Sequence, residues 1–281
     1  MRHAIGALTS VYETLEKHGH ALLPSDGLHE YNNAIAELTP KLSSHDARSV
    51  EVVLICNRLF ISIEVMLRSY MAATKHYFRG LKIMHEAGAR AHIDSANNIV
   101  PAQNSHLPKI DKFMLKVFTA RDPVSPHVRE AARAIRRGRN MTTKEFVQMA
   151  RFVRTEIRAY RAKGRLLAVA ERVVQFLDRV TKLQPGADVK KVLEEKRVLL
   201  GLLEHMQDEF QAPDDGRREF GPYHKRFLSI FHTAVWIPLY MSLWPPTRDI
   251  GEMMPLFDRI SGIAWKASRA REFGKLMDIQ T

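Results

Sequence analysis

The stretch from residue 142 to residue 182 constrains the fold of this chain more than any other part of its sequence. It contains no proline and a single internal glycine, Gly164. At 1.5 Å of rise per residue, it predicts one helix roughly 60 Å long. A helix of that length needs neighbours that bury its apolar side. The sequence therefore predicts an all-α protein.

Basic residues recur along this stretch with a period of seven. The series consists of Lys144, Arg151, Arg158, Arg165, Arg172 and Arg179. Two further arginines, Arg154 and Arg161, lie three residues after Arg151 and Arg158. Seven residues are close to two helical turns, so these side chains are predicted to share one face. The same period predicts a core-facing series on the far side, namely Phe146, Val153, Tyr160, Leu167 and Val174.

Apolar periodicity elsewhere predicts further helices and no convincing strand. Residues 46–87 are apolar nearly all round, which predicts a second long helix buried by several neighbours. Within it, Glu64 and Arg68 lie four residues apart, a spacing that favours an ion pair. Start and stop signals and amphipathic spacing divide the whole chain into about eight to ten helices, including one near 126–138, one near 188–210 and one near 252–277.

We expect residues 1–281 to form a single compact multi-helix domain. Two lobes are the alternative. The N-terminal lobe would span 1–138 around the buried helix 46–87, and the C-terminal lobe would span 139–281, with the basic helix and the apolar segment 227–244.

The charge of the chain is strongly unbalanced. It has 43 lysines and arginines against 31 acids, a net charge of +12, and residues 129–165 account for +9 of it. Such an excess favours a polyanionic partner, and the planar fork of arginine suits phosphate. The residues expected to bind nucleic acid or another anion are Arg136, Arg137, Arg139, Lys144, Arg151, Arg154, Arg158, Arg161 and Arg165. Few aromatic residues are interleaved with them, so contact with the nucleic-acid backbone is favoured over base stacking. The alternative is pairing with acidic residues of other helices or subunits.

The most apolar run, residues 227–244, contains no Lys, Arg, Asp or Glu. Its length reaches the lower edge of what spans a bilayer. Pro238 and His232 lie inside it and favour a kinked, buried core helix instead. If the run docks on a partner or a membrane surface, Trp236, Tyr240 and Trp244 are the residues expected to make the contact.

No phosphate-binding loop, nucleophile motif or metal-binding spacing is visible, so we expect a non-enzymatic chain without cofactor or metal. Asp214, Asp215 and Glu219 resemble the aspartate-rich magnesium motif of all-α terpenoid synthases, but the second motif of those enzymes is missing. Arg121 and His127 match the Arg-x(4–6)-His spacing of HEPN ribonucleases, which chance supplies easily in a chain with 13 histidines.

The single cysteine excludes internal disulfides. It fits a reducing compartment (cytoplasm, nucleus, mitochondrial matrix or virion interior) and argues against secretion.

Together these features predict a structural protein of a larger assembly. It would bind the backbone of nucleic acid, RNA rather than DNA, as a nucleocapsid-like or ribonucleoprotein subunit alongside other protein subunits or copies of itself. The alternative is a matrix-like or peripheral subunit of a membrane complex. In that case the basic face would meet anionic lipid or acidic partners, and residues 227–244 would serve as the docking segment.

Overall fold

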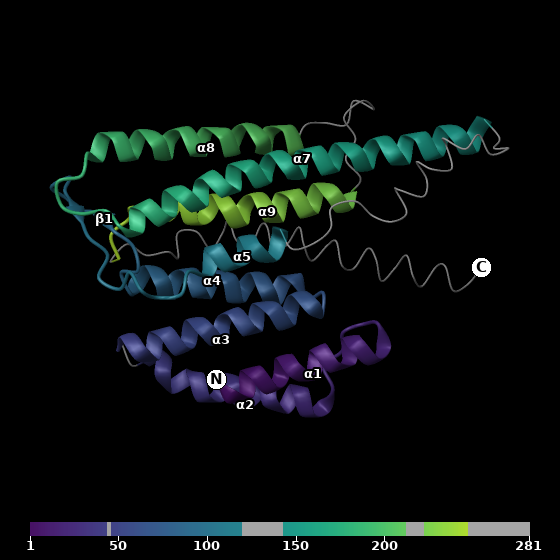
Figure 1. Cartoon of the computed structure of the whole chain (residues 1–281), viewed down its shortest axis with the longest axis horizontal. Coiled ribbons are helices and arrows are strands. Elements are labelled where there is room, and N and C mark those ends of the chain that lie inside the picture. The colour runs from purple at the N-terminus through teal and green to yellow at the C-terminus, as the bar shows by residue number, and fades with distance from the viewer. Residues whose placement is uncertain (44–45, 120–142, 212–221, 247–281) are drawn as a thin grey trace.

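The computed structural model describes residues 1–43, 46–119, 143–211 and 222–246. Within these ranges the chain forms eight helices and one short two-stranded ribbon (Figure 1), so the all-α prediction is confirmed. The elements, in chain order, are α1 (Arg2–His18), α2 (Ser25–Ser43), α3 (Ala47–Met66), α4 (Tyr70–Glu86), β1 (His92–Ile93), β2 (Ile99–Val100), α5 (Ile110–Thr119), α7 (Thr143–Thr181), α8 (Val189–Gln211) and α9 (Pro222–Met241).

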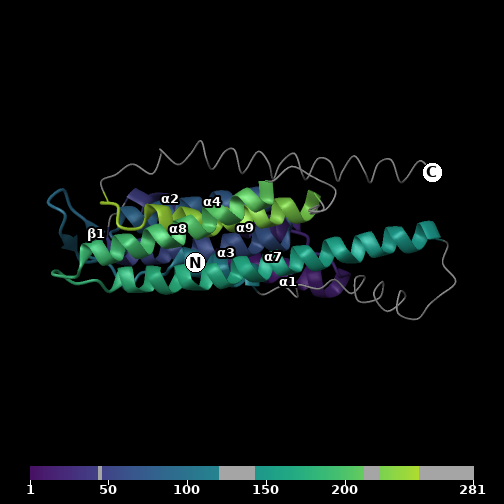
Figure 2. The same ribbon diagram turned by 90° about the horizontal axis from the view of Figure 1, so that it is seen from above.

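The helices run roughly along one common direction and are stacked from the α1–α2 pair, through α3 and α4, to α7 and α8 (Figures 1 and 2). Three apolar clusters hold the stack together. One joins α1, α2 and α3, a central one joins α3, α4, α5 and α9, and a third joins α7, α8 and α9. Helix α9 contributes to two clusters, which explains why residues 227–244 are apolar all round.

Proline at position 238 leaves a gap in the hydrogen bonding of α9. Because proline has no N–H, the carbonyl of Ala234 lacks its usual partner one turn later. The hydroxyl of Tyr77 on α4 donates to that carbonyl at 2.6 Å. Tyr77 is buried, so this hydrogen bond satisfies a polar group inside the core and fixes α9 against α4.

The prediction of one helix over 46–87 is wrong, because the segment forms two antiparallel helices, α3 and α4. The chain reverses at Arg68, which adopts a left-handed conformation with φ of 61°. The N–H of Ser69 then donates to the carbonyl of Glu64 at 2.8 Å. The two helices lie close together at Gly80, where an added Cβ would lie 2.2 Å from Nδ2 of Asn57.

The predicted Glu64–Arg68 ion pair is also wrong. Glu64 instead accepts a hydrogen bond from the Tyr31 hydroxyl at 2.8 Å. Nε2 of His76 lies 3.0 Å from the same hydroxyl. Since the single proton of Tyr31 goes to Glu64, Nε2 of His76 is assigned the proton that it donates to Tyr31. These three residues tie α2, α3 and α4 together.

Some of the remaining predictions concern residues that the structure describes, and others do not. Helix α7 spans the predicted 142–182 segment, and α8 and α9 match the helices expected near 188–210 and within 227–244. The ribbon His92–Val100 is a strand pair that the sequence did not predict. The helices expected near 126–138 and 252–277, and the lobe boundary at 138/139, lie outside the described residues.

Candidate nucleic-acid interface

Among the side chains of α7 that the structure describes, those buried against the bundle all lie beyond the first sixteen residues. The buried positions of α7 begin at Ala159 and continue with Ala162, Leu166, Ala170, Val173, Phe176, Leu177 and Val180. The predicted core series divides along the helix. Leu167 and Val174 are partly buried and pack against the bundle, as expected. Tyr160 is 44% exposed and Val153 is partly exposed, so for these two the prediction is wrong. The side chain of Phe146 lies outside what the structure describes. The helix carries two apolar series, and the one that contains three alanines faces the bundle because small side chains allow the closest approach.

The first part of α7, residues 143–158, projects beyond the ends of α8 and α9 (Figures 1 and 2). We call these residues the overhang. No side chain that the structure describes in the overhang is buried. At 1.5 Å per residue the overhang is about 24 Å long. It presents a helical rod to the surroundings.

Basic side chains follow the overhang into the packed part of α7. Lys144, Arg154, Arg161 and Arg165 are exposed, and Arg158 is partly buried. Within the described ranges, Arg154, Arg158 and Arg161 form no ion pair. These three arginines lie on two helical turns, and no acidic side chain of the described residues pairs with them.

Four of the predicted binding residues cannot be placed in this way. Arg136, Arg137 and Arg139 lie outside the described residues, and so does the side chain of Arg151. The C-terminal end of α7 follows the alternative interpretation, because Arg179 pairs with Glu195 of α8. Within the described residues, the basic series therefore has three arginines without an ion pair, Arg154, Arg158 and Arg161, and one arginine that pairs with α8, Arg179.

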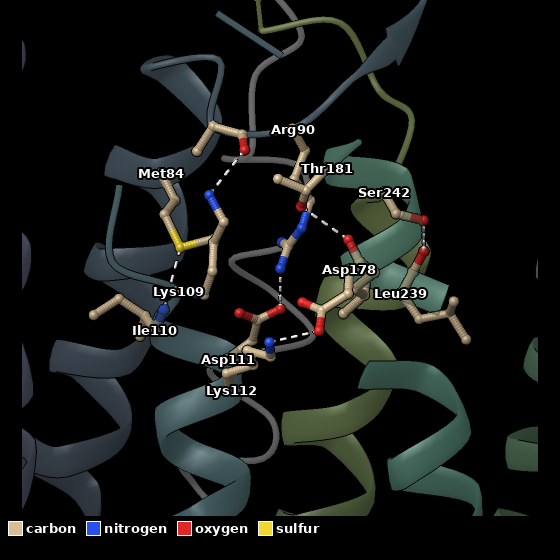
Figure 3. Close-up of polar contacts among 12 residues, drawn as sticks. Met84, Arg90, Lys109, Ile110, Asp111, Lys112, Asp178, Thr181, Leu239 and Ser242 are labelled. Atoms are coloured by element: carbon tan, nitrogen blue, oxygen red, sulfur yellow. Dashed lines mark hydrogen bonds and ion pairs between the residues drawn. The ribbon is translucent and has the colours of Figure 1, made fainter. Parts of the chain in front are cut away.

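A second charged cluster lies inside the bundle, between the loop before α5 and the start of that helix (Figure 3). Arg90 pairs with Asp111, which is only 1% exposed. The Nζ of Lys109 donates to the carbonyls of Ala89 and Ser105 at 3.0 and 3.1 Å. Burial, reinforced by the charge of Arg90, lowers the pKa of Lys109 to about 8.

The sequence did not predict this charged cluster. Arg90 and Asp111 are 21 residues apart, and only the folded loop brings them together. Lys112 pairs with Asp178 of α7 at 2.5 Å, so the same region also fastens α5 to α7. The one available signal was an acidic residue, Asp111, in the first turn of the helix. These contacts join residues of the same chain, so the cluster holds the loop and α5 in place. Within the described residues, Nε of Arg90 and Oδ1 of Asp111 are buried without a hydrogen-bond partner.

Two aromatic residues of α9, Trp236 and Tyr240, form a series of ring contacts with Trp244, which lies just beyond the end of the helix. Trp236 stacks on Tyr240 with ring centroids 4.5 Å apart, and Tyr240 meets the edge of Trp244 at 5.3 Å. All three are partly exposed and pack on the central cluster. Among the described helices, none combines the length and hydrophobicity that crossing a bilayer requires. A docking role for the three aromatic residues stays a prediction.

The residues weighed for enzymatic chemistry, Asp214, Asp215, Glu219, Arg121 and His127, lie outside the described ranges. In the part of the chain that is described, no three His, Cys, Asp or Glu side chains gather as a metal site would require. The interface therefore rests on the basic residues of α7.

Comparisons with known proteins give one informative similarity. No family model matches the chain, and no solved structure matches it. The chain is 29% identical over 279 residues to the transcription regulator lscL of Purpureocillium lilacinum, an alignment that covers 94% of this chain. The chain spans 66% of the length of that protein, slightly less than two thirds.

This similarity contradicts the prediction of a nucleocapsid-like or ribonucleoprotein subunit, and equally the alternative of a structural subunit of a membrane complex. A basic helix face reports an affinity for anions and does not by itself distinguish a particle subunit from a regulator. The relative whose alignment covers 94% of this chain is a transcription regulator.

Proposed function

We propose that this chain is a non-enzymatic helical module that takes part in the control of transcription in the nucleus. The observation that carries the proposal is the similarity to a transcription regulator over 94% of the chain. The single cysteine, which is buried and free, fits the reducing conditions of that compartment.

The partner that we propose for the basic face of α7 is DNA. Arg154, Arg158 and Arg161 lie three or four residues apart, so they follow one side of the helix within about 10 Å. Duplex DNA carries one phosphate charge per about 1.7 Å of its axis, so neighbouring arginines can each reach a different phosphate. The similarity to a transcription regulator gives no support to RNA as the partner.

The proposed contact is with the phosphate backbone and does not select a sequence. The base-stacking alternative would require aromatic side chains among the arginines, and Tyr160 is the one exposed ring between Arg154 and Arg165. Backbone contacts position a protein on DNA, while base contacts specify the sequence. We therefore expect affinity for duplexes of any sequence through this face.

Titration of a fluorescent DNA duplex of arbitrary sequence tests the proposal. The variant changes Arg154, Arg158 and Arg161 to glutamate, and we expect it to lose most of its affinity. The slope of log K against log salt should also become shallower by about 0.9 for each phosphate contact that is lost.

The matched control changes Lys190, Lys191 and Arg197 to glutamate. These three residues are exposed on α8 and away from the overhang, and the change in net charge is the same. We expect the control to keep its salt slope. Equal losses in the two variants would show that only net charge matters and would refute the proposed interface.

The regulatory part of the proposal needs a separate measurement. Fused to an unrelated DNA-binding domain, the chain should change the expression of a reporter gene that carries sites for that domain. The fusion supplies its own DNA contact, so the triple glutamate variant should retain this effect. A reporter that responds to neither form would contradict a role in transcriptional control.

A further inference from the structure

Helix α7 carries a second apolar series on the side that faces away from the bundle. Its spacing alternates between four and three residues, and we call it the outer seam: Phe146, Ala150, Val153, Ile157, Tyr160, Gly164 and Leu167. At 100° per residue, most of this series lies on the opposite side of the helix from the buried series that begins at Ala159. The seam therefore cannot be covered by α8 or α9 along the overhang.

The described side chains of the outer seam remain open to solvent. Ile157 is 43% exposed and Tyr160 is 44% exposed, while Ala150 and Val153 are partly exposed. An added Cβ at Gly164 would meet nothing within 4 Å. Leu167 is partly buried against the bundle and marks the end of the seam. About three heptads of apolar positions with a solvent-facing centre are the pattern of a coiled-coil seam.

The residues beside the seam indicate its partner. In heptad register, Val147, Arg154 and Arg161 border one side of the seam, and Met149, Glu156 and Lys163 border the other. In a parallel pair of identical helices, each side faces the opposite side of the partner helix, so position 156 of one copy meets position 161 of the other. An antiparallel pair would instead place arginine sides together, which is unfavourable.

We infer that two copies of this chain associate through their outer seams as a short parallel coiled coil. The pair is symmetric, as most homodimers are. The small Gly164 lets the two helices approach closely at the point where they enter their bundles. The inference goes beyond the proposed function because it requires neither DNA nor a transcriptional partner.

Sedimentation equilibrium of the full chain without nucleic acid tests the association. We expect a monomer–dimer equilibrium that Ile157→Asp weakens by at least about 100-fold, since each dimer loses two buried isoleucines. The matched control is Phe152→Asp on the same helix. Phe152 is 42% exposed but lies off the seam, so this variant should dimerise like the original chain. Circular dichroism establishes that both variants keep their helices.

Charge exchange and cross-linking test the parallel register. Glu156→Arg and Arg161→Glu should each weaken the dimer, and the double exchange in one chain should restore it. Gly164→Cys should give a disulfide-linked dimer, because equal positions are adjacent only in a parallel pair and the native Cys56 is buried.

Three results would overturn the inference: a chain that stays monomeric at every concentration, equal effects of Ile157→Asp and Phe152→Asp, or a double exchange without rescue. DNA titration of Ile157→Asp, which keeps Arg154, Arg158 and Arg161, is a separate readout, so failure of the dimer and failure of the proposed function are distinguishable.

Discussion

The hydrogen bond between Tyr77 and Ala234 gives a sharp prediction about stability. The carbonyl of Ala234 lacks its helical donor because residue 238 is proline, and the Tyr77 hydroxyl replaces that donor at 2.6 Å. The change Tyr77→Phe keeps the ring and its packing but removes the hydroxyl. It leaves a carbonyl unpaired inside a core where Tyr77 is only 2% exposed.

The magnitude follows from the burial. An acceptor left without a partner in the interior costs about 1–3 kcal/mol, so we expect Tyr77→Phe to lower the free energy of unfolding by about 2 kcal/mol. In a Pro238→Ala background the new N–H of residue 238 can bond to the Ala234 carbonyl. There the same Tyr77→Phe change should cost about 0.5 kcal/mol, which gives a coupling energy of more than about 1 kcal/mol.

The assay is a double-mutant cycle from urea denaturation, followed through the fluorescence of Trp236 and Trp244 on and next to α9. The control is Tyr12→Phe, at a residue that is 52% exposed, and we expect a change within about 0.5 kcal/mol. If Tyr77→Phe has the same cost in both backgrounds, the hydroxyl does not serve the carbonyl that proline leaves open, and the reasoning is wrong.

Three further predictions concern the interior and its titrating groups. Gly201→Ala should raise the free energy of unfolding by about 0.5–1 kcal/mol, because an added Cβ there meets nothing within 4 Å. Gly80→Ala should lower the free energy of unfolding by about 2–4 kcal/mol, because its Cβ would lie 2.2 Å from Nδ2 of Asn57. Both are measured by urea denaturation, and effects of equal sign would contradict this contrast. Burial lowers the pKa of His76 to about 4, so the unfolded chain binds a proton before the folded chain does. The free energy of unfolding should therefore fall by at most about 3 kcal/mol as the pH drops from 6.5 to 4. A His76→Gln variant should lose this part of the pH dependence. The pKa of Lys109 is lowered to about 8, so the unfolded chain again binds a proton first, and stability should rise between pH 8 and 10.5. Lys109→Met should flatten that rise in thermal unfolding measured against pH.

Local pattern was enough to predict the long helices that end in clear signals. Helix α7 follows from an unbroken stretch closed by Pro185 and Gly186, and α8 from its amphipathic spacing. The reversal at Arg68 was not predictable in this way, because an arginine at φ of 61° replaces the glycine that usually marks such a turn. Packing of α3 on α4 near Gly80 favours two helices over one, and that contact is invisible in local sequence.

The candidate interface was predicted in part for a similar reason. A seven-residue period placed Arg154, Arg158 and Arg161 on one face, and the structure describes them without acidic partners. The period could not decide which of two apolar series on α7 faces the bundle. It also could not show that Arg179 finds Glu195, because that contact depends on how α8 returns along α7.

The position of α9 between two clusters has a consequence for synthesis of the chain. Helices α3, α4 and α5 are complete by residue 119, but the α9 side chains that cover their central cluster begin only at Ala234. At roughly 5–20 residues per second, this leaves an apolar surface uncovered for roughly 6 to 25 seconds on the ribosome. We expect nascent chains that stop before residue 222 to be held by chaperones, and chains that extend past residue 246 to be released. Synthesis of α9 therefore sets the moment at which α3, α4 and α5 can complete their folding.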